Sequence, residues 1–283
     1  MERRNIEEKI FKGLMILSTL LILSSLLVIL LTVLIKGLPY LNLAMVTQTP
    51  QGGYYLGKGG GILNAIVGSL YLAGGATFLA ILFSLPVALY LNVYSKSDSK
   101  FVSLFRFAFD VLCGVPSIVY GAFGFTIMIF FGLRASLLGG IIAIALLILP
   151  MMIRSMDEVI RLVPQELLDS SYALGANRLE TTLRVVLKQV LPGVVSAVIL
   201  AFGRGIGDAA SILFTAGYTD SLPGSLLDPV ASLPLAVFFQ LGTPFPEVQQ
   251  RAYAAALILL ILVLALSILS RLITARYNRY VIR

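Results

Sequence analysis

The sequence predicts an all-α, polytopic membrane protein with six transmembrane helices and one long polar loop on the cytoplasmic side. Three observations predict this class. Hydrophobic residues make up 58% of the 283 positions, charged residues make up only 12%, and the mean hydropathy is +0.96. Average soluble domains carry about 25% charged residues. The apolar residues are also gathered into runs long enough to cross the roughly 30 Å hydrocarbon core of a bilayer.

The net charge of +7 does not indicate nucleic-acid binding, because the basic residues are dispersed between the apolar runs. The chain has no histidine and a single cysteine, Cys113, so a disulfide within the chain is excluded and the commonest metal ligand is missing. We therefore predict no metal site, no nucleic-acid partner and no cofactor bound by this chain. Cys113 is interpreted as a core residue.

The first apolar run, residues 13–35, follows a charged segment, and no small-residue cleavage site follows it. Its length predicts a retained membrane anchor rather than a signal peptide. The other five spans are predicted at residues 61–94, 107–131, 137–152, 191–217 and 252–269. Asp110, near the cytoplasmic end of the third span, is expected to reach water or to pair with Arg106. Three prolines inside the spans are interpreted as packing kinks: Pro86, which should bend or end the second span, Pro116 and Pro150.

An even number of spans puts both termini on the same side of the membrane, and basic residues identify that side as the cytoplasm. Sixteen basic residues lie in the terminal segments and in two of the loops, against four in the opposite loops. The predicted division is a cytoplasmic N-terminus (1–12), a transmembrane domain (13–273) with a cytoplasmic loop at 153–190 and extracytoplasmic loops at 36–60 and 218–250, and a cytoplasmic tail (274–283).

The first extracytoplasmic loop contains part of a phosphate-loop pattern, Gly52-x-x-x-x-Gly57-Lys58-Gly59. Gly59 stands where a Ser or Thr would hold Mg²⁺, and no strand precedes the pattern. We interpret it as a flexible loop. The chain thus has no complete nucleotide-binding motif, and we predict a transport subunit that is not itself an enzyme.

The longest polar stretch, residues 163–192, predicts two short helices joined at a glycine. Pro164 suits a first helical position, and Glu166 and Asp169 lie in the opening turn, where the helix dipole favours acids. Gly175 ends this helix, because glycine adopts left-handed dihedrals without steric cost. We call residues 163–192 the elbow.

The second helix of the elbow is expected to begin at Asn177, which forms a capping-box pattern with Glu180. Its apolar residues fall at three- and four-residue spacings and predict one continuous stripe. They are Leu179, Leu183, Val186, Leu187 and Val190. Such an elbow either forms a knob that fits the groove of a partner or lies as an amphipathic loop on the membrane surface.

The fifth span carries two charges, Arg204 and Asp208, which are four residues apart and therefore share one face of a helix. A charge inside the bilayer costs about 2.5–3.5 kcal/mol on insertion scales, so both are candidates for a functional pathway. They form either an internal ion pair or a water-facing arginine that contacts an oxyanion while the carboxylate limits its affinity. Gly203 and Gly207 permit close backbone approach beside them, which equally suits plain helix packing.

The elbow resembles the EAA loop of ABC importer permeases, a Glu-Ala-Ala triplet followed by a glycine. Asp169, Ser170 and Ser171 occupy the triplet, with Asp for Glu and Ser for both Ala, and Gly175 follows. The resemblance implies that the elbow is a coupling helix that docks on an ATP-binding subunit. The residues it assigns to this docking are Glu166, Asp169, Ser170, Ser171, Ala173, Leu174, Gly175 and Ala176.

Four further segments resemble signatures of the permease subunits of phosphate ABC importers, in family order. They are GGILNAIVGSL (60–70), GVPSIVYG (114–121), RGIGDAA (204–210) and DPVASLP (228–234). The last favours the A-type of the two permease subunits. The resemblance implies that Arg204 and the acid four residues later, here Asp208 in place of Glu, act on phosphate.

The same resemblance implies alternating access in a prokaryotic plasma-membrane complex. Its partners would be a second permease subunit of similar fold, a dimer of ATP-binding subunits that hold ATP and Mg²⁺, and an extracytoplasmic phosphate-binding protein that meets the 36–60 and 218–250 loops, with membrane lipid around the spans. Two alternatives stay open. One is a permease for sulfate, molybdate or phosphonate, and the other is an ATP-independent anion transporter, for which the sequence shows no clear inverted repeats.

Overall fold

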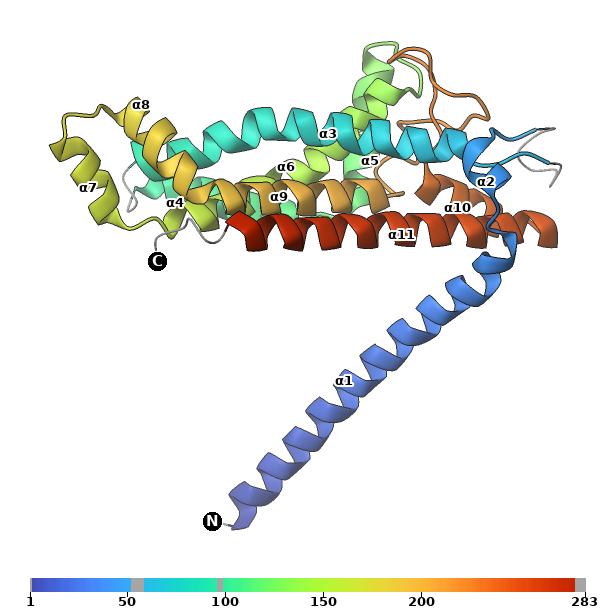
Figure 1. The fold of residues 1–283 in the computed structure, drawn as a ribbon, viewed down its shortest axis with the longest axis horizontal. Helices are drawn as coiled ribbons and strands as arrows, with labels where there is room; N and C mark the ends of the chain where they lie inside the picture. Colours follow the sequence, from blue (N-terminus) through green and yellow to red (C-terminus); the bar gives the residue numbers. More distant parts are fainter. Residues whose placement is uncertain (1, 52–58, 96–98, 278–283) are drawn as a thin grey trace.

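The computed structural model describes residues 2–51, 59–95 and 99–277, which form an elongated bundle of helices with one helix diverging from it (Figure 1). The elements in chain order are α1 (Glu2–Gly37), η1 (Leu38–Tyr40), α2 (Leu43–Thr47), α3 (Leu63–Leu89), η2 (Tyr90–Tyr94), α4 (Lys100–Cys113), α5 (Ser117–Phe130), α6 (Leu137–Arg161), α7 (Gln165–Ala173), α8 (Arg178–Glu180), η3 (Thr181–Val186), α9 (Leu187–Gly207), α10 (Leu233–Leu241) and α11 (Pro246–Tyr277). Here η1 is a 3₁₀ turn, whereas η2 and η3 are π-helical turns.

Within the described residues, five segments are long and apolar enough to cross a membrane. They are Glu7–Tyr40, Leu63–Tyr94, Leu137–Arg161, Arg178–Gly207 and Pro246–Ile273. The bent pair of α4 and α5 makes a sixth crossing if the two helices are taken as one span. The predicted all-α, polytopic class is therefore confirmed.

The centre of the bundle is α6, which packs along both α3 and α9. Ala76 and Ala80 of α3 are fully buried, as are Ile144 and Ile148 of α6. In a bilayer the helices gain no hydrophobic driving force from one another, so close approach over small residues supplies much of the packing energy. The alanines of α3 provide that approach for the branched side chains of α6.

The C-terminal end of the first helix, α1, contacts the bundle. An ideal Cβ on Gly37 would lie 2.6 Å from the backbone carbonyl oxygen of Tyr253, so only glycine lets α1 and α11 come this close. From this contact α1 leaves the bundle at an angle (Figure 1), and Leu20 and Ile22 expose 58% and 67% of their surfaces. Exposed apolar side chains on a membrane-spanning helix are suited to lipid or to another membrane subunit.

The third span, predicted as one helix over residues 107–131, is instead two helices that meet at 98°. Pro116 precedes α5 with extended dihedrals (φ −58°, ψ 139°), and its ring nitrogen has no hydrogen to continue the helical ladder. The hydroxyl of Tyr120 donates across the bend to the carbonyl oxygen of Leu112 at 2.9 Å. Pro116 is thus a break between helices and not a kink within one.

The fifth span, predicted to continue to residue 217, ends at Gly207. The next residue, Asp208, has extended dihedrals, and its carboxylate accepts hydrogen bonds from the backbone N–H and the hydroxyl of Ser211. A short acidic side chain that bonds to nearby backbone competes with the helical ladder, which explains the early end.

Two further boundaries differ from the prediction. The fourth span, predicted to end at residue 152, continues as α6 to Arg161. The predicted 218–250 loop contains α10, whose first turn is anchored because the Leu233 N–H donates to Ser69 Oγ of α3 at 2.8 Å. The partial phosphate-loop pattern falls mainly on residues 52–58, outside the described part of the chain.

Candidate coupling elbow and transport pathway

The elbow lies at one end of the bundle, and α2 and α10 lie at the other (Figure 1). Its first helix, α7, follows Pro164, whose dihedrals (φ −59°, ψ 134°) are extended, so the helix begins one residue later than predicted. Gly175 has φ +85° and ends this part of the elbow. The predicted break at a left-handed glycine is confirmed.

The second half of the elbow begins with a complete capping box. The backbone N–H of Glu180 donates to Asn177 Oδ1 at 2.9 Å, and the backbone N–H of Asn177 donates to Glu180 Oε2 at 3.0 Å. The reciprocal bonds satisfy two N–H groups that would otherwise lack a partner at a helix start. The prediction from the Asn177 and Glu180 spacing is confirmed.

The predicted single apolar stripe is wrong. Val186 and Val190 are buried, whereas Leu179 and Leu183 expose 57% and 49% of their surfaces. Residues 181–186 form the π-helical turn η3, in which each turn holds more residues than an α-helical turn. The wider turn rotates the residues before it relative to those after it, so a pattern with an α-helical period does not stay on one face.

Two hydroxyls fasten α7 to η3. Ser171 Oγ and Thr181 Oγ1 lie 2.9 Å apart, either atom can donate, and both side chains are buried. Ser171 therefore faces inward and joins the first half of the elbow to the second half, which continues into α9.

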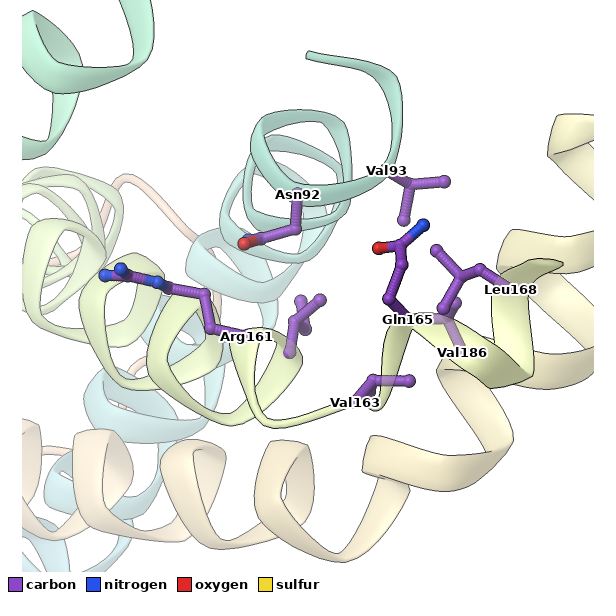
Figure 2. Close-up of a pocket in the computed structure, with 8 residues that line it drawn as sticks. Asn92, Val93, Arg161, Val163, Gln165, Leu168 and Val186 are labelled. Atoms are coloured by element: carbon purple, nitrogen blue, oxygen red, sulfur yellow. The ribbon is translucent and has the colours of Figure 1, made fainter. Parts of the chain in front are cut away.

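A small cavity of about 140 Å³ separates the elbow from the ends of the spans (Figure 2). Its wall includes Val93 of η2, Arg161 of α6 and Gln165 of α7. Figure 2 shows Gln165 reaching toward Val93, while the guanidinium of Arg161 points away from Gln165. Leu168 and Val186, which also line the cavity, belong to the main hydrophobic core. The elbow therefore faces η2 and the end of α6 across this cavity, and Leu168 and Val186 join it to the core.

The outward face of the elbow carries most of the residues that the family resemblance assigns to docking. Those exposed are Glu166, Asp169, Ser170, Ala173, Leu174 and Gly175. Ala176 is half-buried, and Ser171 is buried as described above. Leu174 exposes 89% of its surface at the tip, next to the glycine break.

Arg204 and Asp208 do not share a helix face, because Asp208 lies beyond the end of α9. Arg204 is exposed in the last turn of α9, and no ion pair joins it to Asp208 or to another carboxylate in the described part of the chain. The interpretation as an internal ion pair is therefore wrong. An exposed guanidinium without an acidic partner remains.

Close packing along this turn involves a different glycine from the two predicted. An ideal Cβ on Gly205 would lie 2.9 Å from Cγ2 of Ile144, so this glycine lets α9 approach α6. At Gly203 and Gly207 no described atom of the chain outside their own helical turns lies within 4 Å of an ideal Cβ. Their packing role stays a prediction for contact with a neighbouring molecule.

A buried ion pair, which the sequence analysis missed, lies between α4 and α6. Arg106 Nε and Nη2 donate to Asp157 at 2.9 Å each, and the Asn92 amide donates to the same carboxylate at 2.7 Å. Asp110 pairs with Arg154 at 2.9 Å, so its predicted pairing with Arg106 is wrong. The sequence analysis placed Asp157 in the cytoplasmic 153–190 loop, where an exposed carboxylate is expected, so no local signal indicated its burial.

Charged groups of three helices gather beside the bend between α4 and α5. Cys113, exposed at the end of α4, lies within electrostatic range of Asp110, Arg154 and Arg204. The prediction that Cys113 is a core residue is wrong.

Comparisons with known proteins agree with this architecture. A model of the family described as "Binding-protein-dependent transport system inner membrane component" matches residues 80–279. The chain is 31% identical to the phosphate transport system permease protein PstA of Haemophilus influenzae, over 95% of this chain and 94% of that protein. It is 37% identical to PstA 1 of Mycobacterium tuberculosis, over 76% of this chain and 70% of that protein.

Solved structures show the same fold. Two crystal forms of the MetNI methionine ABC transporter, in inward facing conformations, match with TM-scores of 0.60 and 0.62 at 17% and 18% identity. Each match covers 76% of this chain and 95% of the solved chain. The helical bundle, the membrane-spanning segments and the family match over residues 80–279 lead to one conclusion: the chain belongs to the family of binding-protein-dependent transport system inner membrane components.

Proposed function

We propose that this chain is the membrane-spanning permease subunit of an ATP-driven importer and that its substrate is inorganic phosphate. The observation that carries this proposal is the similarity, over 95% of the chain, to a relative named as a phosphate transport system permease. The exposed elbow and the exposed Arg204 are the two features such a subunit requires. ATP and Mg²⁺ belong to a partner ATPase, which performs the hydrolysis.

The elbow is the proposed contact with that ATPase. Its outward face presents Leu174 between acidic residues of α7 and the glycine break. On its inward face Leu168 packs in the main core and Ser171 joins α7 to η3. A push on the outward face would pass into η3 and α9 through these inward contacts. Since α9 carries Arg204 at its far end, movement of the elbow and movement of the pathway are mechanically linked.

Arg204 is the proposed phosphate contact. Its planar guanidinium forms two parallel hydrogen bonds with tetrahedral oxyanions, and here no carboxylate of the described residues competes for it. The carboxylate of Asp208 is engaged by Ser211. Its role is therefore to hold the turn after α9, which sets the position of Arg204, rather than to neutralise the arginine.

The proposed orientation has both termini and the elbow in the cytoplasm. The start of α1 and the end of α11 lie toward the elbow end of the long axis (Figure 1), and the basic residues are concentrated at that end. The opposite end, with α2 and α10, would meet an extracytoplasmic phosphate-binding protein. A second permease of similar fold would complete the pathway and two ATP-binding subunits would complete the importer.

Reconstitution of the chain with its partner subunits in liposomes tests the proposal. We expect uptake of labelled phosphate that requires ATP and persists in excess sulfate. Arg204→Ala should abolish this uptake while the complex still assembles. Arg134→Ala, which removes an exposed arginine from the loop before α6, is the matched control and should transport normally.

Three outcomes would contradict parts of the proposal. Uptake without ATP would remove the role of the elbow as a coupling element. Loss of labelled phosphate uptake in excess sulfate would assign the pathway to a different oxyanion. Normal uptake by Arg204→Ala would exclude this arginine as the phosphate contact.

A further inference from the structure

Two cavities follow each other along the crevice between α1 and α11, at the end of the molecule away from the elbow. The first, of about 370 Å³, has a wall of mixed character. Its polar residues are Lys36, Tyr40, Gln249, Gln250 and Tyr253, and Ile35, Pro39 and Pro246 complete it. The second, of about 650 Å³, lies between α1, α10 and α11 and is lined by apolar residues alone. Residues 249–253 of α11 line the first cavity and residues 256–263 line the second, so the pair runs from the helix end toward the membrane interior.

The first cavity contains a cation, Lys36, that has no acidic partner among the described residues. Lys36 Nζ lies 4.9 Å from the centroid of the Tyr253 ring and 3.5 Å from its hydroxyl oxygen. In the described part of the chain no carboxylate forms an ion pair with Lys36. Glu247, in the first turn of α11, is exposed and does not line the cavity. The ammonium of Lys36, the tyrosine hydroxyls and the Gln250 amide together offer donors to an anion, while the Gln249 amide donates to the Thr243 carbonyl at 2.8 Å.

The apolar cavity lies further along α11 than the contact between Gly37 and Tyr253, from which α1 diverges (Figure 1). Val33 of α1, Phe238 of α10 and Leu260 of α11 are among its lining residues. A space with no polar partner is a poor site for water, because buried water needs two or more hydrogen bonds.

We propose that this crevice binds an anionic phospholipid, with its phosphate at Lys36 and an acyl chain in the apolar cavity. A phospholipid supplies a negative group joined to an apolar tail, which matches the order of the two cavities along α11. Tyrosine and lysine are also the residues typical of the level of lipid headgroups. A helix of another membrane protein would fill the apolar cavity but would leave the ammonium of Lys36 without an anion.

This inference is independent of the transported substrate, because it requires only that the chain crosses a membrane. It also concerns α1, which precedes the segment matched by the family model. A failure of phosphate transport would leave the lipid site untouched, and the loss of lipid binding would leave the proposed transport function standing.

Native mass spectrometry of the purified, delipidated complex tests the proposal. We expect phosphatidylglycerol to bind more tightly than phosphatidylcholine, and Lys36→Gln to weaken phosphatidylglycerol binding roughly ten-fold or more, as expected for a charge-assisted contact. Lys36→Arg should retain the preference. Lys12→Gln removes the same charge from the opposite end of α1 and should change nothing. Equal binding by wild type and Lys36→Gln would overturn the proposal.

A second measurement identifies the occupant of the apolar cavity. Ala256→Phe fills part of this cavity and should reduce binding of phosphatidylglycerol while the complex remains assembled. A photoreactive phenylalanine analogue at Leu260 should then capture a lipid, recognised by its mass. Capture of a protein chain in place of lipid would assign the crevice to a partner helix and refute the proposal.

Discussion

Asp157 of α6 accepts two hydrogen bonds of 2.9 Å from the guanidinium of Arg106 in α4, and its side chain is 2% exposed. In a second pair the acid and the base exchange helices: Asp110, one turn further along α4, pairs with Arg154 of α6. Among the residues of α4, Val102 is the buried one. Two ion pairs of opposite polarity therefore join α4 to α6, one of them buried and the other largely exposed.

Removal of one partner of the buried pair should destabilise the protein strongly. Asp157→Ala leaves the Arg106 charge without its acceptor, and breaking a buried pair in this way costs about 3–5 kcal/mol. The thermal unfolding temperature of the purified complex should fall accordingly. Glu158→Ala is the control, because Glu158 is 63% exposed and 3.6 Å from Arg154, and exposed pairs contribute about 0–1 kcal/mol. If both variants lowered the unfolding temperature by similar amounts, the burial of Asp157 would not determine how much its ion pair stabilises the protein.

The glycines of α9 should respond differently to added side chains. Gly205→Val places methyl groups against Ile144, and overpacking of this kind costs about 1–3 kcal/mol. Gly203→Ala meets open space within this chain and should be neutral or stabilising by up to about 1 kcal/mol, because alanine favours helices. Thermal unfolding of the complex measures both. A large loss from Gly203→Ala would instead reveal a neighbouring subunit packed against that glycine.

The hydroxyl pair of the elbow is suited to a double-mutant cycle. Ser171→Ala alone leaves the Thr181 hydroxyl buried without its partner, at a cost of about 1–3 kcal/mol. Adding Thr181→Val removes the second polar group, so the double variant should lose less than the sum of the two single losses. Strict additivity in unfolding measurements would mean that the two hydroxyls do not interact.

The tip of the elbow should matter for assembly and not for folding. Leu174→Asp changes a side chain that is 89% exposed. The free energy of unfolding of the isolated chain should therefore change by no more than about 0.5 kcal/mol, as for other surface substitutions. The ATP-binding subunit should no longer co-purify with this variant. Leu227→Asp, at a residue that is 60% exposed in the loop before α10, is the control and should retain the partner. Retention of the ATPase by Leu174→Asp would rule out the tip as a contact.

Local sequence features predicted the parts of the structure that depend on neighbouring residues in the chain. The apolar runs identified most of the spans, because their length and lack of charge are sufficient for crossing a membrane. Gly175 and the pair of Asn177 and Glu180 identified the break and the helix start within the elbow. In each case the interaction that determines the structure joins residues only a few positions apart in the chain.

The tertiary structure decided the features that depend on distant partners. The end of α9 at Gly207 follows from a carboxylate that bonds forward to Ser211, and this left Arg204 exposed without its predicted partner. The burial of Asp157 depends on Arg106, which lies on another helix. The amino-acid sequence alone determined the membrane class and the approximate spans, because hydropathy is a sum over a segment. The pairing of charges across helices was decided by packing, since each carboxylate bonds to the donor that the fold brings nearest.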